Sequence, residues 1–197
     1  MISRRTGFTV IELMITVAIV AILATIAAPS LRDLTQNARM TSLANDLMTD
    51  LSVARGEAVK RGVSVTICSS NNGTSCTASE WRYGWIVFAE TNLGGTEGSV
   101  DSGEGPPLKV ASKINGADED PPSLIINPNP YVTFRPTGVT TPGGGGVTNN
   151  FLLCDSRRTD TVSAAAALNR GRHITVIPSG RAQVTRCTCA NITTCTP

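Results

Sequence analysis

The chain has 197 residues, enough for one ordinary domain and an accessory element. Aromatic residues make up only 4% and charged residues 16%, whereas 18 glycines and 11 prolines are present. This composition excludes a coiled coil or a wholly disordered chain and favours a loop-rich β domain. The formal net charge of +2 requires no nucleic acid partner, and the single histidine, His173, excludes a multi-histidine metal centre.

An apolar run occupies residues 8–28 and contains one charged side chain, Glu12. As a helix it would span about 30 Å, the thickness of a bilayer core. Arg4 and Arg5 precede the run, which predicts a cytoplasmic amino terminus and an exported remainder. A cleaved secretory signal peptide explains this run less well. The apolar region of a signal peptide is shorter than this run and ends at a small-residue cleavage site. A simple membrane anchor leaves Glu12 unexplained, since an unpaired carboxylate in lipid costs on the order of 1–3 kcal/mol.

The helix is predicted to continue beyond Pro29 as far as Arg61, with Gly62 as its cap. Apolar residues recur there at a mean step just under four and form one stripe, while charged residues such as Asp46, Asp50 and Arg55 fall largely outside it. We therefore divide the helix into a transmembrane or fibre-core half, 8–29, and an amphipathic half, 30–62. The members of the stripe are Leu31, Leu34, Ala38, Leu43, Leu47, Leu51, Ala54 and Ala58.

Residues 63–197 are expected to form a β-rich exported head, because short alternating or apolar runs are separated by turns. The expected fold class is α+β, with the long helix packed on a mainly antiparallel sheet. A polar loop is expected at 69–80, an acidic glycine-rich loop at 90–107 and a flexible turn at 136–146. Strands are predicted at 63–68, 81–88, 108–114, 123–126, 131–135 and 147–155, followed by a hairpin of 171–177 and 181–187.

The segment Gly7-Phe8-Thr9-Val10-Ile11-Glu12-Leu13 resembles the prepilin processing motif of type IV pilins and type II secretion pseudopilins. The resemblance implies that residues 1–7 are a leader, that a prepilin peptidase cuts after Gly7, and that Phe8 is then N-methylated. It also implies an assembly role for Glu12, and it places Pro29 at the family's helix kink. Physically, a carboxylate in the apolar run is satisfied when it meets the amino terminus of a neighbouring subunit.

The end of the predicted helix, 54–62, is similar to the GspH/FimT branch of these proteins. So is the order Gly84-Trp85-Ile86-Val87-Phe88, Leu153-Cys154-Asp155 and Ser179-Gly180-Arg181. The branch contains minor pseudopilins of type II secretion and minor pilins of type IV pili, and the resemblance is weaker between about 90 and 146. It implies a pilin-like structural subunit that helps to initiate a fibre or sits at its tip; pilus and pseudopilus remain alternatives.

The same resemblance implies the partners and the location of the chain. The partners would be other minor and major pilins or pseudopilins, the prepilin peptidase and the inner-membrane assembly platform. The chain would cross the bacterial inner membrane once, with a cytoplasmic amino terminus and a periplasmic head, before it enters the fibre.

DNA capture is the alternative function, because charge is segregated along the chain. Residues 80–120 carry eight acids and three bases, net −5, and residues 121–197 carry seven arginines and two acids, net +5. Arg172, Arg181 and Arg186 are the candidate phosphate contacts. FimT proteins that resemble DNA receptors carry Gly-Arg-x-Arg in the terminal hairpin, whereas this chain has Gly180-Arg181-Ala182-Gln183. The second arginine is missing, so the structural role is favoured.

The six cysteines of an exported domain predict disulfides rather than a zinc site, because no paired Cys-x-x-Cys halves occur. Cys68 and Cys76 flank a seven-residue turn that they could bridge. Cys154 and Cys187 lie in strands that could be neighbours, and Cys189 and Cys195 would close a tail loop. The connectivity stays open, since six cysteines allow many pairings.

No catalytic set emerges from the sequence, and neither a metal nor a cofactor is expected. No nucleophile elbow is present, and His173 is interpreted as a half-exposed strand residue. The acidic run at 118–120 lacks the spacing of cation ligands and is interpreted as a solvated turn. The chain is therefore not expected to be an enzyme.

Overall fold

The computed structural model describes residues 8–77, 81–92, 94–111, 124–126, 129–142, 149–154, 171–189 and 195–196. For residues 26–30, 32, 124–126, 142, 189 and 195–196 the description covers the backbone alone. The predicted leader 1–7, the acidic run 118–120, the end of the predicted turn at 143–146 and residues 156–169 lie outside the described residues. The chain divides into two compact units, Met1–Ala38 and Arg39–Pro197.

The first unit is built from the amino-terminal part of α1, a helix that runs from Val10 to Arg61. Thr9 caps this helix: its side-chain oxygen accepts a hydrogen bond from the Glu12 amide at 3.3 Å, and its carbonyl accepts one from the Leu13 amide at 3.2 Å. Thr and Glu three residues apart are the two positions of a capping box. The carboxylate of Glu12 therefore lies in the first turn, where the helix dipole stabilises negative charge.

The large apolar side chains of the first unit are exposed. From Phe8 to Leu23 their exposed fractions range from 52 to 76%. Among the residues that the structure describes, no helix combines the length and the apolar character needed to cross a membrane. The interpretation of 8–29 as a membrane span or fibre-core segment stays a prediction from the sequence.

The second unit contains the remainder of α1, and there the predicted stripe is buried. Five of its members, from Leu43 to Ala58, are at most 8% exposed, whereas Leu31 and Leu34 in the first unit are more than 60% exposed. The helix ends where the sequence predicts, because the Gly62 amide donates to the Ala58 carbonyl at 3.0 Å with a φ of 68°. The buried stripe members are Leu43, Leu47, Leu51, Ala54 and Ala58.

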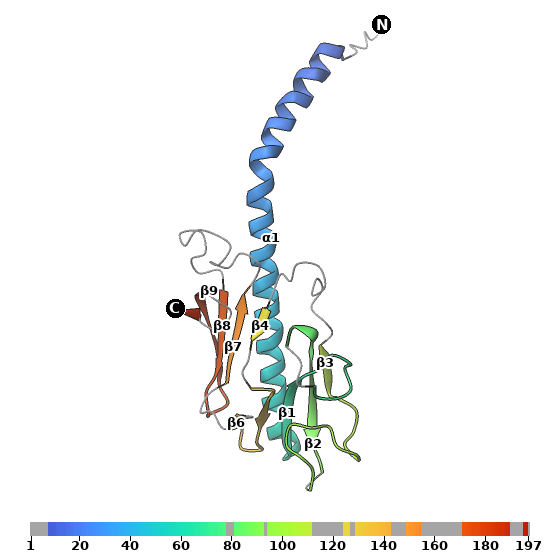
Figure 1. The fold of residues 1–197 in the computed structure, drawn as a ribbon, viewed down its shortest axis with the longest axis vertical. Helices are drawn as coiled ribbons and strands as arrows, with labels where there is room; N and C mark the ends of the chain where they lie inside the picture. The colour runs from blue at the N-terminus through green and yellow to red at the C-terminus, as the bar shows by residue number, and fades with distance from the viewer. Residues whose placement is uncertain are drawn as a thin grey trace, which may run out of the picture. The chain divides into compact units, whose positions relative to one another are not determined.

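In the described part of the head, two five-stranded antiparallel sheets pack on this part of α1 (Figure 1), so the expected antiparallel head is confirmed as a pair of sheets. The first has the order β3-β2-β1-β5-β6 and the second β10-β9-β8-β7-β4. The first sheet consists of β1 (Ser64–Ser69), β2 (Trp85–Glu90), β3 (Lys109–Ala111), β5 (Tyr131–Phe134) and β6 (Thr140–Pro142). The second consists of β4 (Leu124–Ile126), β7 (Asn149–Cys154), β8 (Gly171–Val176), β9 (Ala182–Cys189) and β10 (Cys195–Thr196).

Both faces of the first sheet are buried. Val65 and Ile67 contact the main core beneath α1, whereas Cys68 belongs to a second cluster with Phe88 on the opposite face. Val100, from the loop between β2 and β3, packs against this second cluster. The acidic loop therefore covers a sheet face that the sequence pattern alone would assign to solvent.

One strand prediction needs correction, and two strands were not predicted. Trp81 lies in a short 3₁₀ helix, η1 (Trp81–Tyr83), so β2 begins only at Trp85. The Trp81 ring meets Phe151 edge to face at 4.9 Å, and its indole nitrogen donates to the Asn129 carbonyl at 3.3 Å, which explains why the chain turns here instead of extending. The segment 136–146, predicted as a flexible turn, contains β6, and the tail adds β10.

Asp50 lies on the buried face of α1, where the sequence pattern placed it outside the apolar stripe. It is 2% exposed, accepts a hydrogen bond from the Trp85 indole at 2.8 Å, and forms an ion pair with Lys109. A buried carboxylate is tolerated when its oxygens are paired in this way. Asp50 therefore ties β2 and the edge strand β3 to the helix.

Candidate functional site

The processing and assembly residues lie at the amino terminus, in the first unit. Gly7 is outside the described residues, Phe8 is 75% exposed, and Glu12 occupies the first turn of α1. Glu12 is the one ionisable side chain between Phe8 and Leu31. The segment thus combines an exposed apolar helix with a single carboxylate near its start.

The cysteine predictions have different outcomes. Cys68 and Cys76 form a disulfide that links the end of β1 to the following turn, as the short spacing suggested. Cys154 and Cys187 are both disulfide-bonded, and no free cysteine occurs among the described residues. The strand register sets Cys195 opposite Cys189. The pairings beyond Cys68–Cys76 stay predictions.

The three arginines proposed as DNA contacts do not form one cluster. Arg172 on β8 lies directly opposite Arg186 on β9, at the end of the hairpin away from its turn. Arg181 follows the turn itself, five residues and about 17 Å of extended strand from Arg186. Arg172 also donates to the Thr41 hydroxyl at 3.2 Å, so part of its guanidinium holds the hairpin to α1.

Arg55 of α1 joins two turns that come from different sheets. Its Nε donates to the Gly138 carbonyl at 3.0 Å, and its Nη2 donates to the Ser179 carbonyl at 3.1 Å. The Thr140 amide donates to the Pro178 carbonyl at 2.9 Å beside this contact. Two sequence motifs singled out for their family resemblance, around Arg55 and around Gly180, therefore meet in space, which their spacing could not reveal.

The two turns approach so closely that glycine is required. A Cβ atom added to Gly180 would lie 1.9 Å from the Gly138 carbonyl oxygen, and Gly180 has a φ of +76°. Gly138 has a φ of +79° and lies against the Arg55 side chain. These are left-handed backbone conformations that other residues adopt only with strain.

A groove with a volume of about 530 Å³ lies beside this junction, between α1 and the β8–β9 turn. Its lining includes the cations Arg55, Lys60 and Arg181 together with Leu51 and Val59, and no acidic residue. We call this feature the basic groove. Arg181 is thus grouped with two basic residues of α1 that the sequence analysis did not connect with it.

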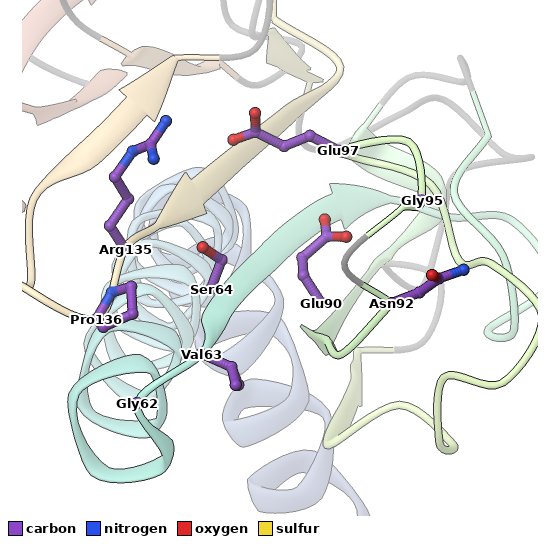
Figure 2. A pocket seen from close by; sticks show the side chains of 9 residues that line it. All are labelled: Gly62, Val63, Ser64, Glu90, Asn92, Gly95, Glu97, Arg135 and Pro136. Atoms are coloured by element: carbon purple, nitrogen blue, oxygen red, sulfur yellow. The ribbon is translucent and has the colours of Figure 1, made fainter.

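A second pocket, of about 330 Å³, lies beyond the end of α1 and contains charges of both signs. Figure 2 shows its side chains, with the carboxylates of Glu90 and Glu97 on one side and the guanidinium of Arg135 on the other. Glu90 accepts hydrogen bonds from the Thr66 hydroxyl at 2.7 Å and the Gly98 amide at 2.9 Å. Glu97 accepts one from the Thr141 hydroxyl at 2.8 Å.

Glu90 is a carboxylate whose environment disfavours its charge. Burial raises the pKa of the Glu90 carboxyl above its ordinary value of 4.5, and the neighbouring charges of Glu104 and Glu97 add to the increase. Its two hydrogen bonds oppose the increase only in part. Glu57, on the surface of α1, shows the reverse: its hydrogen bond with Arg61 lowers its pKa.

The described residues provide no group of three or more His, Cys, Asp or Glu side chains that could hold a metal ion. His173 is half-buried on β8, as the sequence suggested, and its Nε2 lies 3.2 Å from the Asn150 side-chain oxygen and 3.3 Å from the Thr175 hydroxyl. Burial lowers the pKa of His173.

The amino-terminal helix, the two antiparallel sheets and the exposed segment around Glu12 define a pilin-like α+β protein. A family model described as type II transport protein GspH matches residues 43–180, and another described as the prokaryotic N-terminal methylation motif matches residues 2–28. The chain therefore belongs to the GspH family.

The chain is also similar to one named protein and to one solved structure. Fimbrial protein Q of Moraxella bovis is 29% identical over 129 residues, which cover 63% of this chain and 78% of that protein. A crystal structure of the type IV minor pilin FimU of Pseudomonas aeruginosa has a TM-score of 0.51 at 18% identity, covering 82% of this chain and 96% of that one. At this identity the likeness shows the shared fold, which confirms the expected pilin-like architecture.

Gly180→Ala is expected to lower the free energy of unfolding by about 2–4 kcal/mol, because the methyl group collides with the Gly138 carbonyl and the left-handed φ becomes strained. Urea unfolding followed by circular dichroism measures the change. Gly105→Ala is the matched control: nothing lies within 4 Å of the added Cβ and its φ is outside the left-handed range. Equal stabilities of the two variants would contradict the close approach.

Glu90→Gln is expected to flatten the pH dependence of stability above pH 4.5. Because the folded-state pKa of Glu90 is raised, the folded chain binds more protons than the unfolded chain in this window. The stabilisation from that proton is present below 4.5 and is lost as the pH rises through the folded pKa. Gln keeps both accepted hydrogen bonds and carries no charge, so its advantage over wild type should grow with pH.

Unfolding titrations at a series of pH values test this expectation. Glu57→Gln serves as the opposite control, because a lowered pKa stabilises the fold above the unfolded pKa and this contribution disappears as the pH falls. A Glu90→Gln variant that follows the wild-type curve at every pH would show that the Glu90 charge is not disfavoured in the fold.

Proposed function

We propose that this GspH-family protein is a minor pilin or pseudopilin subunit that is assembled through its amino-terminal helix and helps to initiate a fibre or sits at its tip. In this proposal prepilin peptidase removes residues 1–7 after Gly7 and methylates Phe8. The chain is stored in the bacterial inner membrane as a single-pass protein with a periplasmic head, and the assembly platform then moves it into the fibre. The match of residues 2–28 to the N-terminal methylation motif carries the proposal.

The exposed apolar surface of the first unit supports assembly. A continuous row of exposed large apolar side chains requires a cover of lipid or of other helices. The hydroxyls of Thr16 and Thr25 each donate to the carbonyl three residues earlier, at 2.8 and 2.7 Å, so that the helix satisfies their hydrogen-bonding capacity itself. Such a surface suits both storage in a membrane and packing in a fibre core.

The carboxylate of Glu12 would favour one register of packing between neighbouring subunit helices over nonspecific apolar contacts. Once the segment is covered, its carboxylate needs a cation, and the new amino group of a neighbouring subunit is a partner of the right charge. Subunits that share such a helix can copolymerise and still present different heads. A head that differs from the bulk subunit is then suited to one end of the fibre.

Glu12→Ala is expected to leave insertion into the membrane unchanged and to lower incorporation into the fibre by about tenfold or more, because the neighbouring amino group would be buried without a counter-charge. Immunoblots of membrane and sheared-fibre fractions measure both quantities. Asp46→Ala, which removes an exposed carboxylate from the same helix, is the control and should assemble normally. Normal incorporation of Glu12→Ala would exclude the assembly role of this residue.

DNA binding is a second candidate, and the basic groove is the observation that favours it. Arg181 lies there with Arg55 and Lys60, so three cations face one depression. Two features weigh against it: the Arg55 guanidinium already holds two carbonyl groups, and Arg172 and Arg186 lie at the other end of the hairpin. We therefore expect weak and nonspecific binding.

Titration of the full chain against duplex DNA at several salt concentrations separates the two functions. A phosphate contact contributes about 0.9 to the slope of log affinity against log salt. If Arg181 is only one of many surface cations, Arg181→Ala and Arg135→Ala should change the affinity equally and slightly. Tight binding that Arg181→Ala weakens selectively, with a slope lower by about one, would favour the DNA-receptor function instead.

A further inference from the structure

We propose that the outer edge of β9 binds an extended segment of a different fibre subunit, which joins the second sheet as a further strand and carries a carboxylate at each end. We call residues 182–186 of β9 the open edge. This inference rests on the proposed function, because a minor subunit at the start or tip of a fibre contacts subunits other than its own copies. It adds the surface through which one of them is bound.

The open edge directs backbone groups away from the sheet. The Ile177 amide donates to the Arg181 carbonyl at 3.1 Å, which fixes the pairs of β8 and β9 residues that exchange hydrogen bonds. By the alternation of an antiparallel ladder, Ala182, Val184 and Arg186 point their amides and carbonyls away from β8. Among the described residues, β10 pairs with only the last two residues of β9. The outward groups of the open edge are therefore available to another strand.

The open edge is longer than the other described edges of the two sheets. The edge strands β3, β4 and β6 have three residues each, and shortness is one way in which proteins protect a sheet edge from further pairing. The open edge extends over about 17 Å and contains neither glycine nor proline. Val184 at its middle is 43% exposed. An edge with these properties is suited to main-chain pairing with an extended peptide.

A carboxylate fits the end of the open edge at Arg186. Arg186 lies directly opposite Arg172 of β8, and like charges in such positions are destabilising. Arg172 donates to the Gly171 carbonyl at 3.0 Å and to the Thr41 hydroxyl at 3.2 Å. Arg186 is exposed, and its side chain forms no hydrogen bond or ion pair with another described residue. An acidic side chain on an added strand would offset the repulsion between the two arginines.

The other end of the open edge lies in the basic groove. Ala182 lines this groove together with Arg181 and with Leu51 and Val59 of α1, and the lining contains no acid. Ala182 also packs against the main core, and Val184 lies on the same face of the strand. Apolar side chains of an added strand would therefore lie beside Ala182 and Val184, and a second carboxylate fits beside Arg181.

The charges favour a different subunit over a second copy or DNA. Antiparallel pairing of two open edges would bring Arg186 of one copy close to Arg181 of the other, so that cations would meet cations. A DNA phosphate would accept hydrogen bonds from the outward amides but would leave the outward carbonyls facing negative charge. An acidic extended peptide satisfies both the backbone groups and the arginines.

Photo-cross-linking of the full chain in cells that assemble the fibre tests the proposal. Benzoylphenylalanine in place of Gln183, an exposed residue of the open edge, should form an adduct with an acidic extended segment of another subunit, identified by mass spectrometry. The same residue in place of Val110, which is exposed on the edge strand β3, is the control and should give at least about fivefold less adduct. Equal yields, or an adduct with a second copy or with nucleic acid, would overturn the proposal.

Val184→Pro separates main-chain pairing from side-chain contact. Because the Val184 amide points away from β8, proline removes an outward donor and leaves the hydrogen bonds between β8 and β9 in place. With the photoreactive residue at position 183, Val184→Pro should lower the adduct at least about fivefold, whereas Val184→Ala, which keeps the amide, should lower it less than about twofold. Urea unfolding checks that both variants fold.

Arg186→Glu is a second variant that leaves the backbone unchanged. It sets a negative charge against the incoming carboxylate and should lower the adduct at least about fivefold. Arg39→Glu, which reverses an exposed arginine of α1, is its control and should have no effect. An undiminished adduct in Arg186→Glu would overturn the proposal. Immunoblots of sheared fibres distinguish the two proposals: a chain present in fibres without the adduct contradicts only the open-edge contact, and an adduct without incorporation contradicts only the fibre role.

Discussion

The burial of one face of α1 in the second unit is the constraint on which the rest of the head depends. A helix is stabilised mainly by packing of its apolar face, and each fully buried leucine contributes roughly 1.5–3 kcal/mol. Leu47 and Leu51 are at most 1% exposed because both sheets supply core residues to the same face. Neither sheet could lose its contact with the helix without exposing this core, so the sheets are held together through α1.

Polar contacts then fix how the pieces of the head meet. Asp50 holds the edge of the first sheet through Trp85 and Lys109, and Arg55 holds turns of both sheets through backbone carbonyls. Hydrogen bonds to charged groups are directional, which lets them select one arrangement among many that bury similar apolar area. Position 180 must be a glycine because the turn that Arg55 contacts lies against the backbone of Gly138.

The two units differ in whether their carboxylates and apolar side chains find partners within the chain. In the second unit the buried carboxylate of Asp50 has partners within the chain, and the buried apolar residues form two clusters. In the first unit the apolar side chains from Phe8 to Leu23 are exposed, and the segment's one carboxylate, Glu12, lies at its start. A stable head joined to a helix that needs partners is the physical basis for the assembly function proposed here.

The sequence by itself determined the features that depend on neighbouring residues. The end of α1 follows from Gly62, the extended conformation of β1 follows from its own residues, and the bond between Cys68 and Cys76 agrees with a short turn that they could bridge. Only the tertiary structure decided that Arg55 meets residues more than 80 positions away and that Arg181 is remote from Arg172. The reason is physical: spacing along a helix or strand fixes local faces, whereas contacts between turns depend on strand register and on how two sheets pack around one helix.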